Sequence, residues 1–261
     1  MSDAPGQPIT GLKPGEVGEH VFLCGDPARV PRIAASWSNV KEICNVREYR
    51  VAVGELNGQR LAVASTGIGA PSTAVIVEEL AKIVASTLIR IGNSGGLHPD
   101  LALGDLVITT GAVRDDGTSR SYVAAEYPAV ASYDVVGALV EAARASGVRA
   151  RAGITWSLDA FYARNAVLDA AGEIQSMSFE GYRPPELVSR IVQLRAARVL
   201  NCEMESGILL TLASLFGLRA GCICVVSDRA PWPGPSELDL NKNMDACIAV
   251  ATAAMQRLAR G

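Results

Sequence analysis

Residues typical of metal and nucleic-acid sites are scarce in this chain. Of its 261 residues only two are histidines, His20 and His98, and none of the six cysteines forms a C-x-x-C pair. Zinc sites usually need such pairs or clustered histidines, so we expect no zinc centre. The 24 Lys and Arg are outnumbered by 27 Asp and Glu, which gives a net charge of −3. This balance offers no electrostatic attraction to nucleic acid or to an anionic membrane, and neither is expected as a partner.

Signals for secretion and for membrane insertion are also missing. Residues 1–6 are polar and include a proline, without the basic and apolar segments of a signal peptide. The most apolar stretch, 206–227, is interrupted by Arg219 and divides at Gly217 into a helix-like and a strand-like part. We therefore expect a soluble cytoplasmic protein whose cysteines are reduced thiols.

The chain does contain an alternation of apolar strand-like runs and amphipathic helix-like runs. The predicted strands are 20–24, 49–56, 59–65, 86–91, 105–113, 150–156 and 219–226. The predicted helices are 29–36, 72–84, 134–146, 185–197, 205–216 and 241–260. This order predicts an α/β fold, with one domain over residues 1–261 built as a three-layer α/β/α sandwich around a central mixed β-sheet.

Local signals add detail to this prediction. Asn57-Gly58 predicts a tight hairpin between two strands. Ser72 is predicted as a helix N-cap, and Glu78 and Glu79 are expected on the solvated face of that helix. The polar stretch 163–184 and the proline-rich stretch 230–235 are interpreted as active-site loops rather than as linkers.

Two arginines beside glycine-rich turns indicate an anion site. Arg90 ends the apolar run 87–91 and leads directly into a turn of small residues. Arg29 follows Gly25 after a second apolar run, so it lies in a similar place. A guanidinium at the end of a buried strand needs an anionic partner, and small neighbours let backbone N–H groups approach an oxyanion. The alternative is a structural salt bridge at each arginine, but the presence of both sites favours a phosphate.

Two further motifs are ambiguous on their own. The loop from Gly67 to Ser72 resembles a dinucleotide-binding loop, but Ser72 replaces the third glycine and the following strand ends in Arg90, not in an acidic residue. A dinucleotide cofactor is therefore not expected. Glu203 and Glu205 point to different sides of the chain, so one can bind a ribose diol while the other anchors structure. The alternative is that they complement a helix dipole.

Ordered motifs along nearly the whole chain resemble the nucleoside phosphorylase family, and specifically its uridine phosphorylase branch. The matching motifs are Gly25-Asp26-Pro27-x-Arg29-Val30, Arg47-Glu48-Tyr49, Ser65-Thr66-Gly67-Ile68-Gly69-x-Pro71-Ser72, Arg90-Ile91-Gly92-x-Ser94-Gly95, Asp159-x-Phe161-Tyr162, Glu203-Met204-Glu205-Ser206 and Gly217-Leu218-Arg219-Ala220-Gly221. The resemblance implies a pentosyltransferase in which phosphate attacks C1′ of a ribose while the base leaves. It implies inorganic phosphate as co-substrate and no organic cofactor.

The resemblance assigns the phosphate to arginines from two subunits. Gly25, Arg29 and Arg90 would hold it, and Arg47 would reach in from a neighbouring subunit. The active sites would therefore be shared within a homo-oligomer, which by analogy is a ring-like homohexamer.

The sugar and the base have their own implied contacts. Met204 would pack under the ribose, Glu203 would be a further nucleoside-binding residue, Glu205 would bind the 2′ and 3′ hydroxyls, and Phe161 would lie against the base. A monovalent cation such as K+ would lie between subunits, in a site made by three residues: Glu48, the backbone of Ile68, and Ser72.

The chain departs from the family pattern at the phosphate and at the base. The hydroxyl residue expected after Arg-Ile-Gly is here Asn93, whose amide can still donate to phosphate, with Ser94 as the alternative. The Gln-x-Arg pair that reads a uracil edge is absent, and the matching position holds Asn165. Arg164 and Gln175 are the other residues that can take over this role.

Two more departures concern the leaving group and the 5′ position of the sugar. Asp228 and Arg229 combine features of two branches, since the arginine fits the uridine branch and the aspartate fits an acid that serves a purine. Together with Arg90 they are predicted as the catalytic residues, although Asp228 can equally be a turn or cap residue. Ile9 replaces a histidine that would bind the ribose 5′-hydroxyl, and Gln7 or Thr10 is the alternative source of that hydrogen bond.

These features predict phosphorolysis of uridine or of a 5′-modified pyrimidine nucleoside. Two alternatives remain open at this stage. One is a purine nucleoside phosphorylase that uses Asp228, and the other is a non-catalytic nucleoside-binding protein of the same fold.

Overall fold

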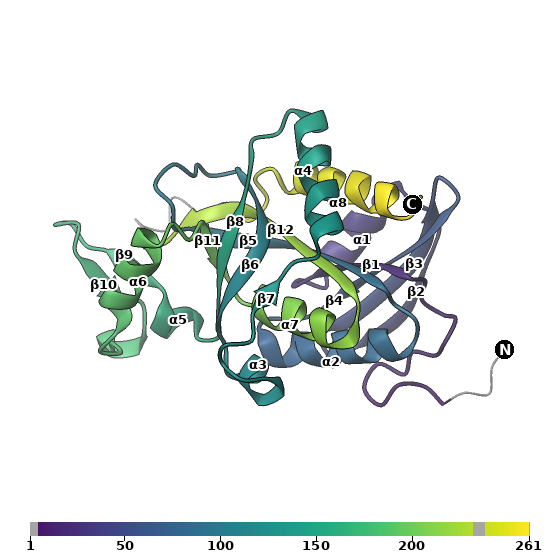
Figure 1. Ribbon diagram of the computed structural model, residues 1–261, viewed down its shortest axis with the longest axis horizontal. Coiled ribbons are helices and arrows are strands. Elements are labelled where there is room, and N and C mark those ends of the chain that lie inside the picture. Colours follow the sequence, from purple (N-terminus) through teal and green to yellow (C-terminus); the bar gives the residue numbers. More distant parts are fainter. Residues whose placement is uncertain (1–4, 232–237, 261) are drawn as a thin grey trace.

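A computed structural model describes residues 5–231 and 238–260. One mixed sheet runs through the molecule in the order β11-β8-β6-β12-β5-β1-β4-β3-β2, with β7 paired to β6 (Figure 1). Its strands are β1 (His20–Cys24), β2 (Ser38–Val46), β3 (Tyr49–Leu56), β4 (Gln59–Ser65), β5 (Thr87–Gly96), β6 (Leu106–Asp115), β7 (Ala129–Val130), β8 (Ala150–Leu158), β11 (Asn201–Glu203) and β12 (Arg219–Arg229). The prediction of a single-domain α/β fold around a mixed sheet is confirmed.

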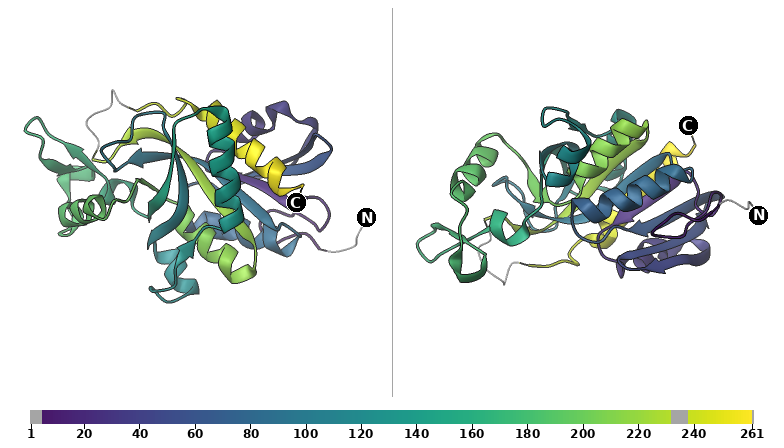
Figure 2. Two further views of the ribbon diagram at one scale, coloured as in Figure 1. Left: turned by 45° about the horizontal axis from the view of Figure 1, so that its top comes forward. Right: turned by 90° about the horizontal axis from the view of Figure 1, so that it is seen from below.

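Helices cover both faces of the sheet. They are α1 (Arg29–Ile33), α2 (Ala70–Lys82), α3 (Gly117–Tyr122), α4 (Tyr133–Ser146), α5 (Phe161–Arg164), α6 (Leu187–Ala196), α7 (Ser206–Phe216) and α8 (Met244–Leu258), with short 3₁₀ turns at Ala34–Ser36 and Phe179–Gly181. One apolar core joins α1, α4 and α8 to the sheet, and a second joins α2 and α7 to the opposite face. Figure 2 shows α4 beside α8 in one view and α2 beside α7 in the other. This arrangement is the predicted three-layer sandwich.

A smaller unit extends from one edge of the sheet. It contains α5, α6 and the two-stranded sheet of β9 (Ala166–Leu168) and β10 (Ile174–Ser176), and it lies at the left of Figure 1. The sequence predicted only a loop over 163–184. Part of the other predicted loop, residues 232–237, lies outside the described residues.

The carboxyl ends of the parallel strands form the edge that carries the site. β5 runs parallel to β1 on one side and to β12 on the other, and β4 runs parallel to β1. Their carboxyl ends therefore meet at one edge, where loops can present polar groups to a ligand. β11 joins β5 in the opposite direction at Gly95 and Gly96 and so brings the segment 201–206 to the same edge.

Several local predictions can be compared with the structure. The Asn57-Gly58 hairpin is confirmed, since both residues have positive φ angles of 52° and 77° between paired β3 and β4. Ser72 is not the N-cap of α2, because Gly69 occupies that position and Ser72 lies in the first turn. Glu79 is buried rather than solvated, because it accepts hydrogen bonds from the N-terminal segment. In the described part of the chain, no helix is both long and apolar enough to cross a bilayer.

Candidate active site

Arg90 lies at the centre of a buried charge cluster. Its side chain is only 4% exposed, its Nε donates to Glu203 Oε2 at 3.1 Å, and its Nη2 pairs with Glu205 Oε2. Burial opposes the charged form of Arg90, but the carboxylates of Glu205 and Glu203 outweigh it and raise the pKa of the guanidinium well above its ordinary value. The third nitrogen, Nη1, is buried and has no hydrogen-bond partner among the described residues. A buried donor that the protein leaves free is available to an acceptor such as water or a ligand oxygen.

Glycines from two turns leave room in front of this free donor. A Cβ atom added to Gly25, after β1, would lie 4.0 Å from Arg90 Nη1 and 3.5 Å from the carbonyl oxygen of Gly67, after β4. Gly67 itself has a φ of 69°, a conformation that glycine adopts without strain. The two turns and Arg90 therefore form a small cradle at the carboxyl edge of the sheet, where the sequence predicted phosphate.

Glu205 faces the same region from the start of α7. The backbone N–H of Gly69 donates to Glu205 Oε1 at 2.5 Å, while Oε2 is held by Arg90. Burial raises the pKa of Glu205, the charge of Arg90 lowers it, and the nearby Glu203 raises it again. The Met204 side chain reaches to 4.0 Å from the position that a Cβ of Gly69 would take. Arg90, Met204 and Glu205, predicted to bind phosphate and ribose, are thus brought together.

The side chains of the other predicted phosphate residues are either held by contacts outside the cradle or exposed. Arg29 Nη1 donates to the carbonyl of Ile91 at 3.4 Å, which holds the side chain beside β5. The Asn93 amide donates to the carbonyl of Leu240 at 3.2 Å, and the Ser94 hydroxyl donates to the carbonyl of Val225 at 3.1 Å. Arg47 is exposed in the turn between β2 and β3, at a φ of 55°. The structure therefore gives Asn93 and Ser94 partners within the protein.

The three predicted cation ligands lie next to one another. A Cβ on Gly67 would approach Glu48 Cγ to 2.8 Å and Ser72 Oγ to 3.2 Å. The Ser72 hydroxyl also donates to the carbonyl of Ile68 at 3.2 Å. The carboxylate, the carbonyl and the hydroxyl all present oxygen atoms, the ligand type that hard cations take.

Asp228 marks the other end of the site. It pairs with Gly95 of β5 after a bulge in β12, and its Oδ2 would lie 3.3 Å from a Cβ on Gly95. Burial raises the pKa of Asp228, and the Ser227 hydroxyl, which donates to Oδ1 at 3.0 Å, partly opposes this rise. The thiol of Cys202 would lie 3.1 Å from the same Cβ and donates to Asn165 Oδ1 at 3.7 Å. Asp228 and Cys202 therefore lie together at Gly95, and Asn165 contacts Cys202; we call these three residues the Asp228 corner of the site.

The alternatives for base recognition are engaged elsewhere. Gln175, on β10, is exposed and donates to Asp169 at 2.9 Å, and Arg164 forms an ion pair with Glu186 at 3.2 Å. Phe161 is 45% exposed and packs edge-to-face on Tyr162, with ring centroids 5.2 Å apart. Of the three residues considered for reading the base, only Asn165 belongs to the Asp228 corner.

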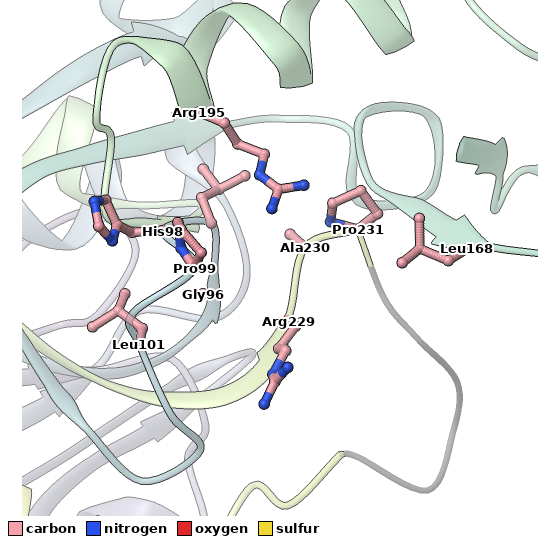
Figure 3. A pocket seen from close by; sticks show the side chains of 10 residues that line it. Gly96, His98, Pro99, Leu101, Leu168, Arg195, Arg229, Ala230 and Pro231 are labelled. Atoms are coloured by element: carbon pink, nitrogen blue, oxygen red, sulfur yellow. The ribbon is translucent and has the colours of Figure 1, made fainter. Parts of the chain in front are cut away.

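Arg229 lies on the opposite side of β12 from Asp228, since neighbouring strand residues alternate. It lines a pocket of about 190 Å³, in which Arg195 of α6 is a second guanidinium (Figure 3). The lining residues are Gly96, Leu97, His98, Pro99, Leu101, Leu168, Arg195, Arg229, Ala230 and Pro231. Arg229 therefore lines this pocket, whereas Asp228 points to the other side of the strand.

Sequence reasoning missed two contributors to the site. One is the backbone N–H of Gly69, which binds Glu205, and the other is Cys202, which contacts Asn165. A glycine that precedes a helix and a cysteine between two polar residues were the available signals. Neither signal identifies its partner, because the partners are 136 and 37 residues away in the chain.

Comparisons with known proteins identify the family. The phosphorylase superfamily model matches residues 19–260. A uridine phosphorylase of Thermococcus kodakarensis is 48% identical over 82% of this chain and 74% of its own length, and a guanosine phosphorylase of Halorubrum lacusprofundi is 36% identical over 84% and 82%. The crystal structure of a Vibrio fischeri uridine phosphorylase superimposes with a TM-score of 0.83, at 29% identity and 98% coverage of both chains. The chain belongs to the phosphorylase superfamily.

Proposed function

We propose that this chain is a pentosyltransferase that cleaves uridine with inorganic phosphate, giving uracil and ribose 1-phosphate. The observation that carries this proposal is the buried, unpartnered Nη1 of Arg90, which faces the cradle of Gly25 and lies next to the carboxylate of Glu205. Arg90 can bind an anion and Glu205 can accept hydrogen bonds from a diol, and one ion pair holds the two side chains together. This arrangement suits a phosphate and a ribose that bind next to each other. The similarity to uridine phosphorylases over most of the chain supports the choice of base.

The geometry suggests how the reaction proceeds. Phosphate binds Arg90, Gly25 and Arg29, while Glu205 accepts the 2′ and 3′ hydroxyls and so fixes C1′ against the nucleophile. A phosphate oxygen forms the new bond to C1′ as the bond from C1′ to the base nitrogen breaks, and the base leaves with that electron pair. Positioning and charge stabilisation supply the catalysis, and the base finally takes up a proton.

The test is the release of free base with and without phosphate. Purified protein is incubated with uridine, thymidine, guanosine and adenosine, and each base is quantified by chromatography. We expect uracil only when phosphate is present, together with an equal amount of ribose 1-phosphate. Release without phosphate would mean hydrolysis, and no release from any nucleoside would leave a binding protein.

A purine is the second candidate, and one residue favours it. Asp228 is buried and its pKa is raised, so it can carry a proton to the nitrogen of a leaving purine. One relative, 36% identical over 84% of this chain, is a guanosine phosphorylase. If guanosine exceeds uridine in the assay above, Asp228→Asn should reduce guanosine cleavage far more than uridine cleavage.

The proposal extends to the assembly, the cation and the location. Arg47 would complete the phosphate site of a neighbouring subunit in a homo-oligomer, for which a homohexamer is the proposed form.

K+ would bind the oxygens of Glu48, Ile68 and Ser72, so replacing K+ by a bulky organic cation should lower the melting temperature. A cytoplasmic location fits six free, buried cysteines. Sedimentation showing an active monomer would contradict the shared site.

The 5′ position of the sugar is a further part of the proposal. Ile9 is 40% exposed, and its N–H is bound by Glu79, which lies ten residues, or about 15 Å along the axis of α2, from Gly69. In the proposed assembly Ile9 would approach the site of a neighbouring subunit, where it would offer no hydrogen bond to a 5′-hydroxyl. We propose that 5′-deoxyuridine is cleaved at least as well as uridine. A strong preference of the wild type for uridine would contradict this, and Ile9→His should shift the preference toward uridine.

A further inference from the structure

The carboxylate of Glu203 accepts more hydrogen bonds than that of Glu205. Its side chain is 1% exposed. Oε1 accepts hydrogen bonds from the backbone N–H and the hydroxyl of Ser206, and Oε2 accepts from Arg90 Nε, from the Ser206 N–H and from the backbone N–H of Glu205. An ionised carboxylate offers about four lone-pair sites, so these donors saturate it.

Glu205 differs from Glu203 in this respect. Its carboxylate accepts from the Gly69 N–H and from Arg90, which leaves about two lone-pair sites for other donors. Two is the number that a ribose diol requires. A ligand can therefore bind Glu205 without breaking a contact, whereas it could reach Glu203 only by displacing protein donors.

The two carboxylates compete for one guanidinium. With Nε held by Glu203, Arg90 can give only Nη2 to Glu205, and Nη1 remains directed toward Gly25. Without Glu203, the guanidinium would be free to turn and form a two-pronged pair with Glu205, the geometry that arginine and carboxylates prefer. That rearrangement would occupy the lone pairs meant for the diol and would turn Nη1 away from the phosphate cradle.

We infer that Glu203 is a positioning residue that sets the phosphate subsite and the ribose subsite in register, and does not itself bind the nucleoside. It does so through two contacts, one to Arg90 Nε and one to the backbone N–H of Glu205. The inference rests on the proposed function and revises the role expected for Glu203 from the sequence. Its physical basis is that a misplacement of about 1 Å between reacting groups can cost roughly 100-fold in rate.

The experiment compares Glu203→Gln with a matched control at the same helix start. Ser157→Ala is the control, because Ser157 Oγ accepts the Gly207 N–H at 2.9 Å in the first turn of α7 without touching Arg90. We expect Glu203→Gln to lower kcat about 100-fold and to raise the KM of both uridine and phosphate. Ser157→Ala should keep kcat within about threefold, because it leaves Arg90 in place.

A double-mutant comparison separates positioning from general damage. If Glu203 acts through Arg90, then adding Glu203→Gln to Arg90→Lys should lower kcat by much less than it does in the wild type. Equal losses in both backgrounds would overturn the inference. Should Glu203→Gln fail to fold, Glu203→Asp, which keeps the charge but withdraws the carboxylate from Arg90, takes its place with the same expected loss.

Binding of sulfate gives a readout that does not depend on turnover. Calorimetric titration of the wild type with sulfate, at constant ionic strength, should show one site per chain. Glu203→Gln should weaken this site at least tenfold, and Ser157→Ala should leave it unchanged. Unchanged sulfate affinity and kcat in Glu203→Gln would refute the positioning role and leave phosphorolysis standing, whereas absence of phosphorolysis in the wild type would refute the proposed function alone.

Discussion

Arg90 is the only cation that contacts Glu203 and Glu205 in the described structure, so its removal should affect stability as well as binding. Arg90→Ala leaves two carboxylates buried without a counter-charge, and breaking a buried pair in this way costs about 3–5 kcal/mol. We expect a loss of this size in the free energy of unfolding, measured by urea denaturation. We also expect phosphate affinity to disappear while uridine affinity is largely kept.

Glu205→Gln provides the contrast to Arg90→Ala. Its amide keeps the shape of the side chain but loses the charge and one acceptor, so the contact to the ribose hydroxyls weakens. The KM of the nucleoside should rise and kcat should fall, while phosphate affinity stays closer to that of the wild type. If both variants gave the same kinetic signature, the division of Arg90 and Glu205 between phosphate and ribose would be wrong.

Asp228 should make stability depend on pH in a defined direction. Burial raises its pKa in the folded state, so the folded protein binds this proton more tightly than the unfolded chain does. The stability that the protonated form contributes is present below the unfolded pKa and is lost as the pH rises through the folded pKa. Asp228→Asn should therefore gain stability relative to wild type as the pH rises above about 4. An equal difference at every pH in denaturant titrations would contradict this.

At the scale of elements, the N-terminal loop depends on one buried glutamate. Glu79 of α2 accepts hydrogen bonds from the Ile9 N–H at 2.8 Å, the Thr10 N–H at 2.9 Å and the Thr10 hydroxyl at 2.7 Å. Glu79→Ala leaves these donors unpaired, at a cost of about 1–3 kcal/mol. We expect faster proteolytic cleavage near residues 7–12, with α2 intact by circular dichroism. Glu78→Ala, on the same helix, should leave the loop protected.

Sequence patterns predicted the buried elements better than the exposed ones. The central strands are apolar on both sides and the hairpin contains Asn57-Gly58, so both were recognised. β2 was missed because it is an edge strand whose residues are mostly exposed and lack alternation. Glu79 was placed wrongly because its partners lie 69 and 70 residues away, a distance at which helical periodicity carries no information.

In the candidate site, the sequence predicted which residues come together but not how their side chains pair. The glycine-rich turns and the Glu203-Met204-Glu205 motif indicated which residues meet, because they lie at strand ends. They did not indicate that Arg90 would bridge two glutamates, nor that Asn93 would bind the carbonyl of Leu240. Such pairings depend on side-chain directions in the folded chain, which spacing along the sequence does not specify.

At the scale of the whole molecule, exposed apolar side chains near the two ends of α2 bear on the proposed shared site. Ile68, in the turn that precedes α2, is 79% exposed, and Tyr122 of α3 is 40% exposed while it donates to Glu78 of α2 at 3.2 Å. Exposed large apolar side chains of this kind are typical of a surface that another subunit covers. Arg47 is also exposed, and from a second subunit it would add the positive charge that a dianion requires.

Mixing two defective variants tests this shared site directly. In a dimer of Arg47→Ala with Arg90→Ala, one site would combine an intact Arg90 with an intact Arg47 from the other subunit, whereas the second site would lack both. Each variant alone should be nearly inactive, but random reassembly after mild denaturation should restore about one quarter of wild-type activity, since half of the dimers are mixed and half of their sites are intact. Mixing Arg90→Ala with Glu205→Gln is the control, because both residues belong to one chain and no large recovery should follow. Equal recovery in both mixtures would place Arg47 outside the neighbouring site.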